Sequence, residues 1–362
     1  MKKLISTLIL IILSTFAFAA GPSTLAKSER GLWPHALNTA ELFDFASRME
    51  ILVYVKHINQ VHAMDEATLK GYLGLKNVNP ASVKEFSELM KTRLLNNMAL
   101  AGAMDSKLDW ISGEARTWAQ LSRLSNAQQE KLPEAYKAWY ADADQFYAAY
   151  AYEQYRLAAL FPGITSEIMK LDDREYSGSE YADKRFIMTF DDGPTAAGGN
   201  TDKTLELLRK NGRTGIFFVL GSSLSQRKSA VTGLYDGMSV GAHGVEHKAH
   251  TKAGVWADLG GLLDTTAKLS SGEACWFRPP YGQRNMALIE FLSERGCQLM
   301  LWNIDSQDWN KNMSVKDVED RMTSLMLMWR SGILLFHDVH AKAAGALPAL
   351  WESFDGAGVV WE

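Results

Sequence analysis

The 362-residue chain lacks a surplus of either charge, since 38 basic and 42 acidic residues give a net charge of −4. Without a basic surplus, the composition gives no indication of a nucleic-acid partner. Long apolar runs are lacking beyond the N-terminus, so we find no second candidate for a membrane span. Hydrophobic residues make up 47% and charged residues 22%, as in soluble globular proteins, and the length predicts two domains.

Cysteine is scarce, because the chain contains only Cys275 and Cys297. Each lies beside an apolar segment that we expect to be a β-strand. If the two strands are neighbours, the cysteines can form a disulfide bond in an oxidising compartment. Two buried free thiols are the alternative, and the sequence leaves both open.

The N-terminus has the pattern of a secretory signal peptide. Lys2 and Lys3 precede the apolar run 4–13, and Ala17-Phe18-Ala19 offers a small-x-small cleavage motif. The apolar run is short for a membrane span, which favours cleavage over an uncleaved anchor. We therefore predict that residues 1–19 are a signal peptide. The mature chain would have no transmembrane anchor and would be periplasmic or secreted.

Residues 20–165 are poor in glycine and lack strand patterns, so we predict an all-α domain of open role. Asn79 is expected to cap a helix that begins at Pro80. An aromatic stripe follows at helical spacing, and a packing face is favoured over a surface that stacks on sugar rings. Its members are Tyr136, Trp139, Tyr140, Phe146, Tyr147 and Tyr150.

The pattern changes after the helical region. Residues 166–184 are polar and are predicted to be a linker. From residue 185 onward, short apolar runs alternate with helical patterns, which indicates parallel strands joined by crossover helices. Seven such units favour a closed or nearly closed barrel, so we predict an α/β fold for residues 185–362. The expected strands are 185–190, 215–220, 238–242, 274–278, 298–304, 332–336 and 358–361.

Chemically active residues follow the expected strands. In folds of this kind the active site lies at the C-terminal ends of the strands. Those ends carry FDDGP, HGVEHKAH, RPPYG, DSQDW and HDVH, and five of the eight histidines fall in two of these loops. The adjacent carboxylates Asp191 and Asp192 also need a cationic partner, such as a metal or an arginine. The clustering therefore predicts an active site at one end of the barrel.

His243 and His247 are four residues apart, a spacing that suits two metal ligands. With a carboxylate from another strand, they would leave coordination positions open for catalysis. His250 is an alternative third ligand, but its spacing from His247 requires a particular loop geometry. We expect His250 to lie at the surface instead.

These five motifs resemble, in the same order, those of the NodB-type polysaccharide deacetylases, carbohydrate esterase family 4. The resemblance covers residues 185–362 and implies a distorted (β/α)7-type barrel. It also implies that Asp192, His243 and His247 bind a divalent metal, commonly zinc, with cobalt or nickel as alternatives. One position departs from the family: Gly244 stands where a serine or threonine usually follows the first histidine. The missing hydroxyl would normally brace the loop that holds His247.

The resemblance implies catalytic roles for five further residues. Asp191 would be the general base, and Arg278 would hold it in place. His337 would protonate the leaving amine, with Asp305 and Asp308 in the motif that supports this acid.

Contacts with the substrate are implied for Pro280, Tyr281, Trp309 and Leu335. The backbone N–H of Tyr281 would help to stabilise the oxyanion, and Leu335 would line the pocket for the acetyl methyl group. Trp309 would line the groove.

The predicted function is hydrolysis of the N-acetyl groups of an N-acetylhexosamine glycan by metal-activated water. Peptidoglycan, a chitin-like polymer and an exopolysaccharide are all candidate substrates. An O-deacetylase or a deformylase could use the same site. A non-catalytic glycan-binding protein with a relict barrel is the alternative from a different class, although a binding protein needs neither Asp191 nor His337.

Overall fold

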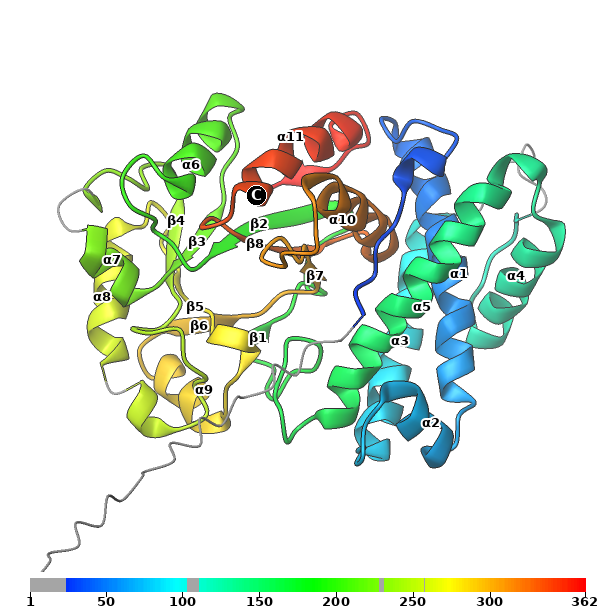
Figure 1. Cartoon of the computed structure of the whole chain (residues 1–362), viewed down its shortest axis with the longest axis horizontal. Helices are drawn as coiled ribbons and strands as arrows, with labels where there is room; N and C mark the ends of the chain where they lie inside the picture. The colour runs from blue at the N-terminus through cyan, green and yellow to red at the C-terminus, as the bar shows by residue number, and fades with distance from the viewer. Residues whose placement is uncertain (1–23, 103–110, 228–230, 257) are drawn as a thin grey trace, which may run out of the picture.

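The computed structural model describes residues 24–102, 111–227, 231–256 and 258–362, so the expected signal peptide lies outside the described residues. The first half is helical, as predicted (Figure 1). Its helices are α1 (Ala40–His62), α2 (Glu66–Leu73), α3 (Pro80–Leu100), α4 (Trp118–Lys131) and α5 (Lys137–Leu160), with short 3-10 helices at Arg30–Leu32 and Glu134–Tyr136. Among the described helices, none combines the length and the apolar character that a membrane crossing needs.

Local sequence determines where these helices begin. The side chain of Asn79 accepts a hydrogen bond from the backbone N–H of Ser82, and Pro80 occupies the first turn of α3, as predicted. The aromatic stripe on α5 is a packing face, because Trp139 and Tyr147 are no more than 1% exposed. The prediction of a core role for this stripe is therefore confirmed.

The second half is built on a parallel sheet with the strand order β1-β6-β5-β4-β3-β2-β8-β7, and β9 pairs beside β2. The strands are β1 (Glu175–Tyr176), β2 (Arg185–Asp191), β3 (Ile216–Val219), β4 (Ser239–Ala242), β5 (Cys275–Phe277), β6 (Cys297–Met300), β7 (Ile304–Asp305), β8 (Gly332–His337) and β9 (Val360–Trp361). The sheet forms a half-barrel whose edges are β1 and β7. This arrangement confirms the predicted α/β barrel class.

One expected strand, 298–304, is divided in the structure into β6 and β7. The intervening residues cross from one edge of the half-barrel to the other. Leu301 donates its N–H to the carbonyl oxygen of Tyr176 in β1, whereas the side chain of Asn303 accepts the N–H of Ile333 in β8. The side chain of Asn303 thus replaces a backbone partner where the strand is interrupted.

Helices cover the outside of the sheet (Figure 1). They are α6 (Asn200–Lys210), α7 (Gly221–Arg227), α8 (Leu259–Leu269), α9 (Met286–Ser293), α10 (Val315–Trp329) and α11 (Ala341–Phe354), with short 3-10 turns at Ala253–Val255 and Pro280–Gly282. α10 packs against β7 as well as against α1 and α3 of the helical half. Because α10 is buried from Asp320 to Trp329, the two halves share one continuous apolar core.

The expected linker, residues 166–184, contains a strand of the sheet. Glu175 in β1 is 1% exposed and forms a buried ion pair with Arg284. Arg284 also donates to the carbonyl oxygens of Ser166 and Met169. Glu175 thus pairs with a buried arginine, while the polar residues around it resemble a linker in the sequence.

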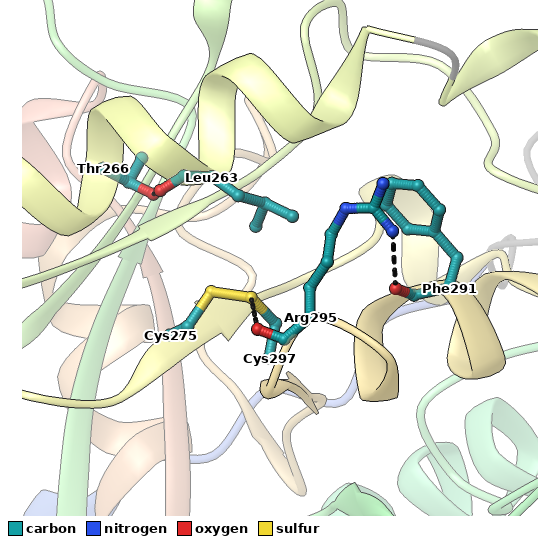
Figure 2. The surroundings of a disulfide bond; sticks show 6 residues. All are labelled: Leu263, Thr266, Cys275, Phe291, Arg295 and Cys297. Carbon is teal, nitrogen blue, oxygen red and sulfur yellow. Dashed lines mark hydrogen bonds between the residues drawn. A yellow bond between two sulfur atoms is a disulfide. The ribbon is translucent and has the colours of Figure 1, made fainter.

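The two cysteines form a disulfide bond (Figure 2). Cys275 and Cys297 are register partners on the neighbouring parallel strands β5 and β6. Leu263 of α8 packs in the same apolar cluster as Cys297, and Arg295 lies over the ring of Phe291 beside the bond. Of the two alternatives that the sequence leaves open, the structure shows the disulfide.

Candidate active site

β2 delivers two adjacent carboxylates to the mouth of the half-barrel. Side chains alternate along this strand, so Asp191 shares the inward face with Ile187, and Phe190 faces the outer helices. Asp192 leaves the strand with a left-handed φ of 80°, and its N–H donates to the Phe218 carbonyl oxygen. Both carboxylates approach His243, but only Asp191 pairs with Arg278 and only Asp192 pairs with His247.

Asp192, His243 and His247 form a cradle for a cation. Asp192 Oδ1 lies 3.4 Å from His243 Nε2 and 3.5 Å from His247 Nε2. Ligands bound at about 2.1 Å around one tetrahedral zinc ion would stand about 3.4 Å apart, so these spacings fit such an ion. Within the described residues, Asp192 Oδ1 is buried without a hydrogen-bond partner, which is consistent with a role as a metal ligand.

The surroundings of the two histidines suit them to act as metal ligands. His243 Nδ1 lies 2.8 Å from the carbonyl oxygen of Arg278, which can only accept, so Nδ1 carries the proton and Nε2 presents its lone pair to the cradle. Burial, together with the nearby His243, lowers the pKa of His247, although Asp192 opposes this shift. Neutral imidazoles are the form that binds metals.

Arg278 holds Asp191 in a dry environment. The guanidinium is 0% exposed, and its Nη1 donates to Asp191 Oδ1 at 2.8 Å and to Thr189 Oγ1 at 2.7 Å. Its plane is also supported by the Phe218 ring, 4.2 Å from the guanidinium carbon. Because Oδ1 of Asp191 is taken by Arg278, Oδ2 remains toward the cradle, 3.7 Å from His243 Nε2.

His337 ends β8 on the other side of Asp191. Its Nδ1 lies 2.7 Å from Asp308 Oδ1, and its backbone N–H donates to Asp308 Oδ2 at 2.8 Å. Burial lowers the pKa of His337, but the charge and the hydrogen bond of Asp308, together with the charges of Asp191 and Asp192, outweigh it and raise the pKa to about 10. The site therefore places a protonated imidazole beside an ionised carboxylate and a metal cradle.

Residues 178–300 match the polysaccharide deacetylase family. The chain is 33% identical over 172 residues to the peptidoglycan-N-acetylglucosamine deacetylase of Listeria monocytogenes, which covers 45% of this chain and 34% of that protein. It is 32% identical over 167 residues to the peptidoglycan-N-acetylmuramic acid deacetylase of Bacillus subtilis, with the same coverage of 45% and 34%. A family 4 carbohydrate esterase from Streptomyces lividans, solved with acetate, superposes with a TM-score of 0.41 at 29% identity, over 48% of this chain and 88% of that chain.

The matched residues include the motifs FDDGP, HGVEH and RPPYG. The family resemblance predicted from the motifs is thereby confirmed. The chain spans about a third of the length of these curated relatives. Asp305, Asp308 and His337 lie beyond the matched residues, so their place in the candidate site comes from the geometry described above.

The other predicted residues occupy different layers of the half-barrel. Leu335 is buried in the interior of the barrel, and Pro280 is buried at the turn that follows β5. Tyr281 is 58% exposed, with its ring 4.4 Å from that of His247, and Trp309 is 46% exposed. Tyr281 has a φ of 60°, so the turn rather than the side chain determines where its backbone N–H points.

Asp305 and Asp308 are not equivalent. Both carboxylate oxygens of Asp308 contact His337, whereas those of Asp305 accept hydrogen bonds from the backbone and side-chain amides of Gln307. Asp308 is therefore the residue that holds His337 in place. Asp305 instead shapes the loop that leads from Asp305 to Asp308.

The expectation that His250 lies at the surface is wrong, since it is 1% exposed. Its ring packs 5.3 Å from that of Phe277, and Nδ1 contacts the Lys248 carbonyl oxygen. Gly244 has a φ of +96°, and a Cβ atom there would lie 2.6 Å from His250 Cε1. The imidazole thus fills the space beside Gly244, where the sequence suggests a missing hydroxyl.

Asp338 is a buried residue of the site that the sequence analysis did not single out. It is 0% exposed, and burial raises its pKa to about 7, with Asp192 and Asp191 adding to the shift. A Cβ at Gly193 would lie 2.2 Å from Asp338 Oδ2, so the glycine of FDDGP makes room for this carboxyl. Its position directly after His337, in HDVH, is the sequence signal that could have identified Asp338 as a residue of the site.

Proposed function

We propose that the chain is an exported, metal-dependent deacetylase that hydrolyses the N-acetyl groups of an N-acetylhexosamine glycan. One observation carries the proposal: an arginine-held carboxylate, a three-ligand cradle and an aspartate-bound imidazole converge at one mouth of the half-barrel. Amide hydrolysis needs an activated water, stabilisation of the tetrahedral oxygen and an acid for the leaving amine. The convergent groups supply each requirement.

A divalent cation held by Asp192, His243 and His247, with zinc favoured over cobalt or nickel, would polarise the acetyl carbonyl and lower the pKa of a water molecule. Asp191 accepts the proton of the attacking water, because Arg278 keeps its carboxylate oriented and balances its charge.

His337 then donates its proton to the amide nitrogen as the C–N bond breaks, which releases acetate and a free amine. Asp308 keeps this imidazole protonated and correctly turned before the step. In this scheme Leu335 lines the pocket for the acetyl methyl group. Tyr281 and Trp309 offer exposed aromatic surfaces on which sugar rings can stack.

A cell-envelope glycan is the proposed substrate, because the peptidoglycan deacetylases of Listeria monocytogenes and Bacillus subtilis share this domain. Export is supported by the signal-peptide pattern of residues 1–19 and by the disulfide between Cys275 and Cys297, since such bonds persist in oxidising compartments.

Acetate release tests the proposal. Purified protein loaded with zinc or cobalt is incubated with N-acetylated chitooligosaccharides and with peptidoglycan, and the products are identified by mass spectrometry. We expect one mass loss of acetyl per hydrolysed residue, no release by His337→Ala, and loss of activity after chelation. Metal-loaded protein that binds these glycans but releases no acetate from any N- or O-acetylated glycan would support the non-catalytic alternative.

A further inference from the structure

We infer that the helical half is a positioning part of the catalytic site, acting through Glu153 of α5 and Arg321 of α10. Arg321 holds the backbone at Asp305, and this contact fixes the loop that presents Asp308 to His337. The inference rests on the proposed function for its kinetic consequence, although the geometry itself does not.

Arg321 uses its donors on three separate segments. Nε donates to the carbonyl oxygen of Asp305 at 2.8 Å, Nη1 donates to Ala26 O at 3.0 Å and Glu153 Oε1 at 3.1 Å, and Nη2 donates to Glu153 Oε2 at 2.8 Å. Arg321 is 1% exposed and Glu153 is 3% exposed. A buried guanidinium fork with four hydrogen bonds therefore connects α5, the N-terminal segment and the end of β7.

The loop from Asp305 to Asp308 transmits this position to the acid. The N–H of Gln307 donates to Asp305 Oδ1 at 2.9 Å, and the N–H of Asp308 donates to Ser306 Oγ at 3.2 Å. Gln307 has a φ of 57°, a conformation that neighbouring contacts must hold in place. Since both oxygens of Asp308 contact His337, a shift of this loop would turn the imidazole.

The segment before α1 reinforces the same connection. Ala26 donates its N–H to Glu153 Oε1 at 2.6 Å, Lys27 forms an ion pair with Asp317 at 3.0 Å, and Ser28 Oγ lies 3.2 Å from Ser324 Oγ. In Figure 1 this segment passes beside α10. Glu153 is thus held by the N–H of Ala26 as well as by Arg321.

Stability alone does not account for this arrangement. A buried ion pair costs desolvation that its attraction often only offsets, so it is weak evidence for a stabilising role. Arg330, which caps the C-terminus of α10, offers a comparison. Arg330 is also 1% exposed and binds Asp44 and Asp183 across the two halves, yet it lies at the other end of α10, beside the start of β8.

The test compares Arg321→Lys with Arg330→Lys in the full-length, metal-loaded protein. Each variant replaces a planar guanidinium by a single ammonium at a buried position, inside α10 for Arg321 and at its C-terminal cap for Arg330. We expect Arg321→Lys to lower kcat about tenfold or more with KM within about twofold, because misplacing a catalytic group affects the transition state rather than binding. Arg330→Lys should leave kcat within about twofold of wild type, and both should bind metal normally.

Hydrogen exchange supplies a readout that does not depend on activity. In Arg321→Lys the amides of residues 305–308 and of His337 should exchange faster than in wild type, whereas Arg330→Lys should leave them protected. If Arg321→Lys does not fold, Glu153→Gln and Asp44→Asn form the second pair, with the same expected contrast.

The inference is overturned if the two variants have equal effects on kcat and on exchange, or if Arg321→Lys changes neither. Failure of the proposed function would look different. Wild type would then release no acetate, while the selective loss of protection in Arg321→Lys would still establish how the loop is held.

Discussion

Asp191 and His337 are register partners on the adjacent parallel strands β2 and β8. Both side chains therefore leave the sheet on the same face at the same level, and the proposed base and the proposed acid flank one point. Each is paired with a partner of opposite charge from a different strand end: Arg278 for the carboxylate and Asp308 for the imidazole. This separation lets neighbouring groups hold opposite protonation states at one pH.

The two adjacent aspartates should separate metal binding from turnover. Asp192→Ala removes the carboxylate of the cradle, so zinc affinity should fall about tenfold to a hundredfold or more and activity should be lost with it. Asp191→Asn should keep the metal and lose at least about a hundredfold in kcat, because the base is gone while Arg278 and the cradle remain. Calorimetric zinc titration and acetate release measure the two effects. Both variants binding zinc and hydrolysing normally would contradict the assigned roles.

The pH profile should depend on Asp308. Asp308 holds the pKa of His337 at about 10, against an unperturbed value of about 6.5. In the proposed mechanism His337 acts as an acid, so activity should fall as pH rises through this pKa. Asp308→Asn should therefore move the alkaline limb of kcat to lower pH. Asp305→Asn, whose carboxylate contacts Gln307, should move it less.

The same pair has a signature in stability. A raised folded-state pKa contributes stability that is fully present below about pH 6.5 and is lost as pH rises toward about 10. The difference in Tm between wild type and Asp308→Asn should thus be largest below about pH 6.5 and should shrink as the pH increases. A difference in Tm that is independent of pH would show that His337 is not charged through this pair.

The sequence revealed the parts of the site that are local. FDDGP, HGVEH and RPPYG each lie at the C-terminal end of a strand, and these ends meet at one edge of a parallel sheet. The sequence alone therefore predicted that Asp192, His243 and Arg278 lie close together. Periodicity likewise predicted the helices of the first half.

What the sequence could not supply depends on pairing over long separations. Glu153 and Arg321 are 168 residues apart, and no periodic pattern relates them. The strand at Glu175 was hidden because it has only two residues and lies in a polar segment. His250 looked like a surface residue, since only the folded loop shows that Gly244 leaves room for its ring.

Restoring the family's hydroxyl at Gly244 should be harmful in this chain. With a φ of +96° and His250 Cε1 2.6 Å from an added Cβ, Gly244→Ser is strained and crowded. We expect a loss of about 1–3 kcal/mol in the free energy of unfolding, together with weaker metal binding through the displaced His247. Gly254→Ser is the matched control, because a Cβ there meets no atom within 4 Å.

A double variant separates the strain from the crowding. Gly244→Ser with His250→Ala should recover part of the lost metal affinity, since the clash is removed while the unfavourable φ stays. Thermal unfolding and zinc titration of the three variants measure both effects. If Gly244→Ser were as stable and as tightly metal-binding as wild type, His250 would not be what fills this space.

The disulfide should stabilise the side of the barrel that carries Arg278. Cys275 and Cys297 are separated by 22 residues, and closing a loop of this length contributes about 3 kcal/mol in the chain-entropy description. Replacing both cysteines by serine should lower the free energy of unfolding by about this amount, measured by denaturant titration, and leave kcat at low temperature nearly unchanged. A reducing agent should lower the unfolding midpoint of wild type and not that of the double variant. Equal responses of the two proteins to reduction would show that the bond adds nothing to stability, because only wild type has a bond to break.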